Sequence, residues 1–106
     1  MDANKRKRLE AAGFVVGSAA EFLDLGPEDA ALVEMRLALS RALRERRNAA
    51  GLTQAALARR LGSSQSRVAK MEAGDPGVSL DLLVRALLAT GASRRDVGEA
   101  VARKVA

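Results

Sequence analysis

Hydrogen-bonding and cationic side chains are concentrated in the stretch TQAALARRLGSSQSRVAKMEAG, which spans residues 53–74. The Gln65 side chain carries an amide that donates and accepts hydrogen bonds at the same time, and Arg67 and Lys70 carry positive charges that pair with anions. The stretch contains a single acidic residue, Glu72, which lies near its end. These residue types suit non-covalent recognition of an anionic surface that presents hydrogen-bonding groups.

Catalytic chemistry is poorly represented in the chain. It has no Cys and no His, which removes thiol nucleophiles, imidazole bases, disulfides and the usual soft metal ligands. No pair of carboxylates lies in an apolar context that would tune one of them as a catalytic acid. We therefore expect no enzymatic activity, no metal site and no cofactor.

Charge is distributed unevenly along the 106 residues, whose net charge is +5. Residues 18–35 hold five acids and no base, whereas residues 36–70 hold nine bases and only one acid, for a local charge of +8. A surplus of this size in a short segment favours a polyanionic partner. A solvated helix face has the same composition, so the charge pattern by itself leaves both interpretations open.

Nothing in the sequence predicts membrane insertion or export. No run of about 18 apolar residues is present, and the basic N-terminus lacks an apolar signal core. We expect a cytoplasmic protein that makes no contact with membranes.

Apolar periodicity and helix-terminal residues predict an all-α fold. Ala, Leu, Arg and Glu are strong helix formers, and aromatic residues make up only 2% of the chain. A short helical N-terminal extension, residues 1–26, precedes a domain at residues 27–106. Thr53, Ser79 and Ser93 are predicted N-caps. The five helices of the domain are predicted at residues 27–50, 54–61, 65–73, 80–90 and after Ser93.

The first helix of the domain carries apolar residues on two sides. One stripe should face the main core, and a narrower pair, Val33 and Leu37, should be covered by residues 14–25. The residues of the longer stripe are Leu32, Met35, Leu39 and Leu43.

The stretch at 53–74 is predicted to form two helices at a steep angle rather than one interrupted helix. Ala58 is small where the second helix would cross, Gly62 suits a turn residue of positive φ, and Val68 fills the joint. Leu57 and Met71 flank this contact as core residues. The arrangement is that of a helix-turn-helix unit, and its second helix leaves a polar outer face without acids.

These motifs resemble the Cro/C1-type helix-turn-helix regulators, also called the xenobiotic-response-element family. The match consists of Leu52-Thr53-Gln54, Leu57-Ala58 with Leu61-Gly62, Gln65 with Val68, and Glu72-Ala73-Gly74, and it covers roughly residues 38–91. The resemblance implies a five-helix lambda-repressor-like domain that binds double-stranded DNA sequence-specifically, as a transcriptional repressor on paired half-sites.

The resemblance also implies roles for individual residues. Base contacts are expected from the start and outer face of the second helix of the unit, at Gln65, Ser66, Arg67 and Lys70. Phosphate contacts are expected at Gln54, Thr53, Ser63, Ser64 and Arg60. Ser63 and Ser64 could instead cap the helix, and Arg59 and Arg60 could form a solvated face. Arg47 and Glu72 occupy positions that form a structural ion pair in the family.

The last helix carries a row of valines that suits one of two roles, a two-fold dimer contact or packing back onto the domain. We expect the dimer, with an interface made by Leu88, Val97, Val101 and Val105. The basic residues 5–8, KRKR, fit a minor-groove arm, a toxin-binding segment or a solubilising tail.

The size and layout of the whole chain resemble HigA-type antitoxins, which implies a cognate toxin as a further partner and autoregulation of its own operon. The alternative function is a protein-interaction module that neutralises a toxin or bridges transcription machinery, with weak DNA binding. The polar outer face of the second helix argues for DNA binding.

Overall fold

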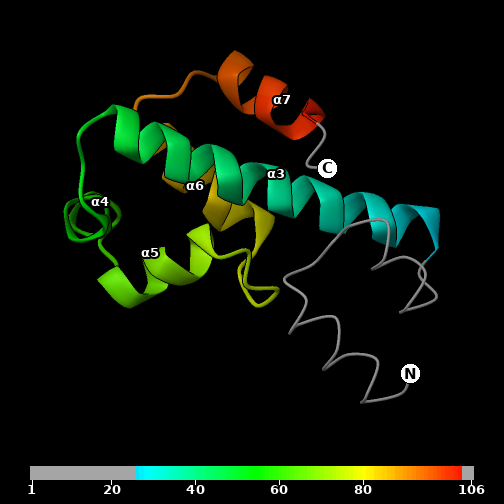
Figure 1. Ribbon diagram of the computed structural model, residues 1–106, viewed down its shortest axis with the longest axis horizontal. Helices are drawn as coiled ribbons and strands as arrows, with labels where there is room; N and C mark the ends of the chain where they lie inside the picture. The colour runs from blue at the N-terminus through cyan, green and yellow to red at the C-terminus, as the bar shows by residue number, and fades with distance from the viewer. Residues whose placement is uncertain (1–25, 104–106) are drawn as a thin grey trace.

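The computed structural model describes residues 26–103, and this part of the chain is entirely helical apart from turns and loops, as predicted. The positions predicted for residues 1–25 and for Val105 lie outside the described residues. The described residues form five helices, α3 (Pro27–Ala49), α4 (Gln54–Leu61), α5 (Gln65–Glu72), α6 (Leu80–Ala89) and α7 (Arg94–Ala102), whose arrangement is drawn in Figure 1.

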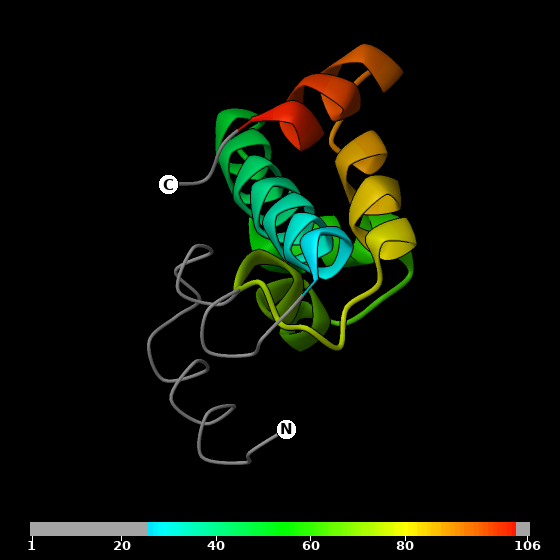
Figure 2. The same cartoon turned by 90° about the vertical axis from the view of Figure 1, so that its right-hand side faces the viewer.

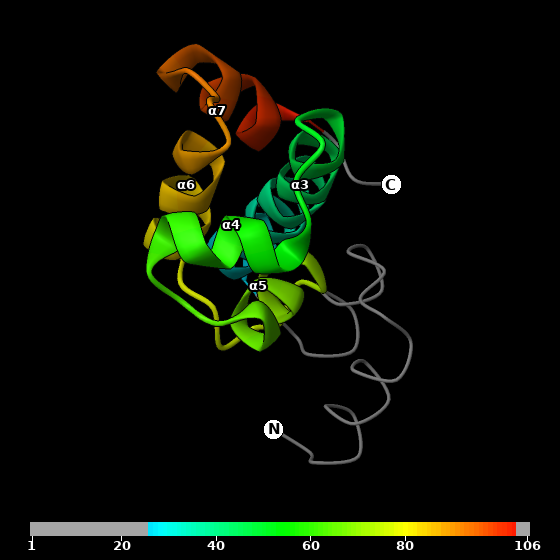
Figure 3. The ribbon, with the colours of Figure 1, turned by 90° about the vertical axis from the view of Figure 1, so that its left-hand side faces the viewer.

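The long helix α3 runs through the middle of the domain beside α6. Helices α4 and α5 lie on one side of α3, and α7 lies on the opposite side (Figures 1 and 2). In Figure 3, α4 is seen from the side and α5 is seen nearly end-on, so the two helices cross at a steep angle. The domain therefore has one side made by the α4–α5 unit and another made by α7.

Residues at the helix ends explain where the elements begin and stop. The hydroxyls of Thr53, Ser79 and Ser93 accept hydrogen bonds from the backbone N–H groups three residues later, as predicted. At the other end of α4, Gly62 adopts a left-handed conformation with φ of 63°. This conformation costs glycine little, so the chain can turn sharply before α5 begins.

The core lies where α3, α4, α5 and α6 meet. Seven large side chains are less than 2% exposed, and burying each contributes about 1.5–3 kcal/mol. They are Leu39, Leu43, Leu57, Val68, Met71, Leu83 and Leu87.

The predicted apolar stripe of α3 enters the core only in its second half. Leu39 and Leu43 are buried, whereas Leu32 is 42% exposed because α3 extends past α6 and α7 at its N-terminal end (Figure 1). Leu37 lies against Gly74, at the end of α5. The cover predicted for Val33 and Leu37, residues 14–25, lies outside the described residues.

No helix within residues 26–103 is both long and apolar enough to cross a membrane.

Candidate nucleic-acid interface

The turn between α4 and α5 has the local structure that the sequence predicted. Ala58 and Val68 are buried at the joint, and the Ser63 N–H donates to the Ala58 carbonyl at 2.8 Å. The Ser64 hydroxyl accepts from the Arg67 N–H at 3.2 Å and caps α5. Two short helices are thereby held at a fixed angle, with α5 presented at the surface.

A buried ion pair fixes α5 against α3. The Arg47 guanidinium donates to both carboxylate oxygens of Glu72, through Nε to Oε2 and through Nη2 to Oε1 at 3.0 Å. Its Nη1 donates to the Leu52 carbonyl at 2.8 Å. The side chains are only 12% and 5% exposed, so water screens their attraction weakly. The hydrogen bonds to Glu72 raise the pKa of Arg47 above its ordinary value.

Two glutamines extend this pair to the surface. Gln54 Nε2 donates to Glu72 Oε1 at 3.2 Å, and Gln65 Nε2 donates to Gln54 Oε1 at 2.7 Å. Gln54 begins α4 and Gln65 begins α5, so the first turns of both helices lie side by side. The two predicted contact residues, one for phosphate and one for bases, are in direct contact with each other.

The outward face of α5 is polar and free of acids. Gln65, Ser66, Arg67 and Lys70 are all exposed, while the sole acid of this helix, Glu72, is turned inward to Arg47. All four residues predicted to contact bases are therefore open to solvent on a single short helix.

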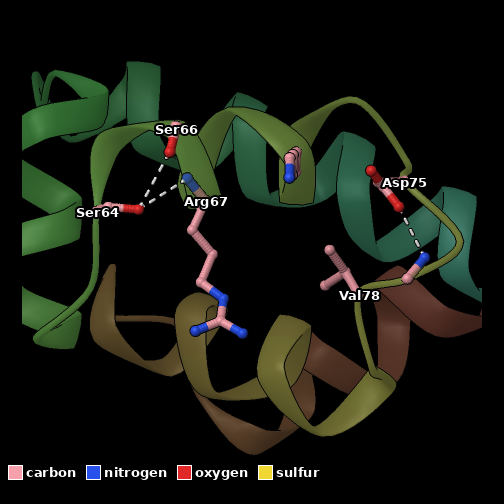
Figure 4. Close-up of a pocket in the computed structure, with 7 residues that line it drawn as sticks. Ser64, Ser66, Arg67, Asp75 and Val78 are labelled. Atoms are coloured by element: carbon pink, nitrogen blue, oxygen red, sulfur yellow. Dashed lines mark hydrogen bonds between the residues drawn. The ribbon is translucent and has the colours of Figure 1, made fainter.

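A shallow hollow of about 350 Å³ runs along this face. Figure 4 shows Arg67 extending within it, with Ser64 and Ser66 at one end and Asp75 at the other. Gly77, Val78 and Lys70 complete the lining, and the Asp75 carboxylate accepts from the Gly77 N–H at 2.7 Å.

The loop that lines this hollow was not among the predicted site residues. The sequence DPG at 75–77 predicts a turn, since Asp side chains bond the backbone two residues later. The residues of a turn do not predict against which face of a neighbouring helix the loop will pack. In the structure, the Arg36 Nε donates to the Val78 carbonyl at 3.2 Å and ties the loop to α3.

The five predicted phosphate contacts fall into two groups. Gln54, Thr53 and Ser64 lie at the first turns of α4 and α5, where backbone N–H groups favour anions. Ser63 has a buried hydroxyl that finds no hydrogen-bond partner among the described residues, and Arg60 Nη1 donates to the Ala89 carbonyl at 3.3 Å, at the end of α6. A phosphate contact from Ser63 requires its buried hydroxyl to reorient, whereas the guanidinium of Arg60 has further N–H groups beyond the one that bonds Ala89.

The residues predicted to form a dimer interface differ in their exposure to solvent. Leu88 is 45% exposed on α6, whereas Val97 and Val101 are half-buried and pack against the core from α7. Val105 lies outside the described residues.

A family model described as a helix-turn-helix domain matches residues 38–103. The chain belongs to this family, and its matched region contains the joint, the ion pair and the outward face of α5. The domain is of the type found in DNA-binding regulators. Neither the curated proteins nor the solved structures contain a match.

Proposed function

We propose that this protein is a sequence-specific repressor of transcription that binds double-stranded DNA with α5 in the major groove. The observation that carries the proposal is the acid-free face of α5, whose first residue is hydrogen-bonded to the first residue of α4. Gln65, Ser66, Arg67 and Lys70 supply the hydrogen-bond donors and acceptors with which side chains distinguish base pairs in that groove.

Phosphate contacts are proposed at the N-termini of the two helices. Gln54 has a second side-chain N–H beyond the one that bonds Glu72, and it is available to a phosphate oxygen. The hydroxyls of Thr53 and Ser64 accept capping bonds. Thr53 can still donate its own hydrogen, and Ser64 can do so when Ser66 is the donor in the bond between their two hydroxyls. Ser63 and Arg60 are secondary candidates because the Ser63 hydroxyl is buried and the Arg60 guanidinium donates to the Ala89 carbonyl. This proposal includes no catalysis. It places the protein on DNA in the bacterial cytoplasm.

The experiment is a salt titration of binding to the promoter of its own gene. Neutralised phosphates release counterions, so the logarithm of the affinity should fall linearly with the logarithm of salt concentration, with a slope of about −0.9 per phosphate contact. Lys70→Ala should weaken binding and flatten the slope by about one if Lys70 contacts phosphate, and should leave the slope unchanged if it contacts a base. An affinity independent of salt would contradict the proposal.

We also propose that the protein binds as a homodimer. Repressors of this type bind half-sites about 34 Å apart, and a two-fold dimer matches that spacing. Leu88 supports the proposal because a large apolar side chain is open to solvent on α6, beside α7. Leu88→Glu should convert a dimer to a monomer in sedimentation equilibrium while leaving thermal stability nearly unchanged. A monomeric unsubstituted protein at the concentrations that saturate DNA would refute it.

A toxin-neutralising role is the second proposal. It is supported by the N-terminal end of α3, where Leu32 is exposed next to the exposed acids Glu28 and Asp29, a surface suited to a basic partner. The neighbouring open reading frame tests this role: a small basic nuclease-like gene product that binds the protein would support it, and a neighbour that does not bind would oppose it.

A further inference from the structure

The hydrogen bonds that connect α3, α5 and α4 form a chain with a fixed direction. Arg47 donates to Glu72, Gln54 also donates to Glu72, and Gln65 donates to Gln54. The chain runs from the Arg47–Glu72 pair, in which the Glu72 side chain is 5% exposed, to Gln65, the exposed first residue of α5. The two links made by Gln54 and Gln65 depend on which end of each amide faces its neighbour.

The carboxylate of Glu72 determines that direction. An ionised carboxylate only accepts hydrogen bonds, and both carboxylate oxygens of Glu72 accept one from Arg47. The Gln54 amide must therefore turn its NH₂ group toward Glu72. Its carbonyl oxygen consequently faces Gln65, and that oxygen also only accepts. Gln65 is forced in turn to direct its own NH₂ group at Gln54.

Within residues 26–103, this orientation leaves Gln65 with one N–H donor and its carbonyl acceptor free. A donor beside an acceptor complements adenine, which presents N7 as acceptor and N6 as donor in the major groove. The opposite orientation would leave both N–H groups free, and two donors complement guanine, which presents N7 and O6 as acceptors. The direction of the chain therefore separates two bases that the same side chain could otherwise bind.

We propose that Glu72 is a positioning residue that sets the base preference of Gln65 through Gln54, favouring adenine over guanine. This inference rests on the proposed function, because it assumes that Gln65 contacts a base. Glu72 itself does not touch DNA in this arrangement.

The experiment measures the affinity for operators that differ only in adenine or guanine at the base contacted by Gln65. The unsubstituted protein should prefer adenine by on the order of 10- to 100-fold. Glu72→Gln supplies a donor at position 72, which lets both glutamines turn round, so the preference should fall to a few fold or less. Equal weakening for both operators would assign Glu72 a purely structural role and overturn the proposal.

A double-mutant cycle tests whether Glu72 acts through Gln54. Gln54→Ala should also reduce the adenine preference, although it leaves the Arg47–Glu72 pair intact. Adding Glu72→Gln to Gln54→Ala should then change the preference no further. If Glu72→Gln lowers the preference equally in both backgrounds, the route through Gln54 is wrong.

Two further variants separate this effect from unfolding. Arg47→Met combined with Glu72→Leu replaces the pair by apolar side chains of similar size, a change that proteins commonly tolerate, and it should also abolish the adenine preference. Glu45→Gln makes the same chemical change at an exposed carboxylate that pairs with Arg103, and should leave the preference intact. Retention of the preference in the apolar double variant would overturn the proposal.

A measurement without DNA distinguishes failure of this inference from failure of the proposed function. In the free protein, Glu72→Gln should shift the NMR signals of the Gln65 side-chain NH₂ group, whereas Glu45→Gln should not. Absence of that shift would overturn the inference that Glu72 sets the orientation of the Gln65 amide through Gln54. If the shift occurs but the unsubstituted protein binds all DNA sequences equally, the proposed function fails and the assignment of base preference fails with it.

Discussion

The two sides of α3 are joined to the rest of the domain by ion pairs of very different kinds. On the side of α5, the Arg47–Glu72 pair has side chains that are 12% and 5% exposed. On the side of α7, Arg103 and Glu45 are 53% and 55% exposed. A buried pair is costly to break because one charge is left without a partner, whereas an exposed pair is replaced by water and salt.

This difference indicates that α5 is fixed more firmly than α7. The helix with the acid-free face is held at its C-terminal end by a pair that is weakly screened, and its first residue is hydrogen-bonded to α4. Helix α7 is attached by half-buried valines and by pairs that salt screens. A pre-oriented α5 lowers the entropy cost of binding in a groove, which favours specificity.

The largest expected effect comes from breaking the buried pair. Arg47→Ala leaves the Glu72 carboxylate buried without its partner and should lower the free energy of unfolding by about 3–5 kcal/mol. Removal of the exposed pair by Arg103→Ala should cost about 0–1 kcal/mol. Urea unfolding of both variants measures the contrast, and similar losses would refute the difference between the two sides.

A smaller effect is expected at the glycines that end α4 and α5. Gly74 has a φ of 75°, and a Cβ there would lie 2.9 Å from Leu37 Cδ2, whereas nothing lies within 4 Å of a Cβ at Gly62, with a φ of 63°. Gly62→Ala should cost about 1–2 kcal/mol for the backbone alone. Gly74→Ala should cost more, since Leu37 must also shift. Equal unfolding energies for the two variants would show that the contact of α5 with α3 adjusts freely.

The smallest effect is expected at the start of α7. Asp96 and Ser93 form a capping box in which the Ser93 N–H donates to the Asp96 carboxylate at 2.8 Å. Arg46 Nη2 lies 3.1 Å from Asp96 Oδ1. The bonds from Ser93, with a smaller contribution from Arg46, hold the pKa of Asp96 below its ordinary value of 3.8.

A pKa that is lowered in the folded state gives stability that is complete above the unfolded value and is lost as pH falls through the folded value. Asp96→Asn should therefore lower the melting temperature slightly at neutral pH. The difference from the unsubstituted protein should shrink as the pH falls below 3.8 and through the lowered pKa of folded Asp96. A difference that stays constant from neutral pH down to full protonation of Asp96 would mean that the charge of Asp96 contributes nothing.

Local sequence signals predicted the helices because those signals act over a few residues. Thr53, Gly62 and Ser93 determine where helices begin and turn, and each does so through its own backbone or through a bond to a residue three positions away. The exposed polar face of α5 followed in the same way from helical periodicity. The bond between Gln54 and Gln65 could not be predicted from these signals, because it depends on the angle at which α4 and α5 meet.

Long side chains near helix ends were the least predictable. Arg60 was a candidate for phosphate binding, and its guanidinium lies at the Ala89 carbonyl, 29 residues away in the sequence. Leu32 fits the apolar stripe of α3, and its exposure depends on how far α3 extends beyond its neighbours. Both outcomes are decided by the lengths and crossing of the helices rather than by local pattern.

The central claim, that α5 reads a DNA sequence, is tested most directly by selecting bound duplexes from a random pool. The unsubstituted protein should enrich two-fold related half-sites centred about 34 Å apart, and Gln65→Ala should lose the base preference at one position in each half-site. Enrichment of no sequence by the unsubstituted protein, or of the same bases by Gln65→Ala, would contradict the account.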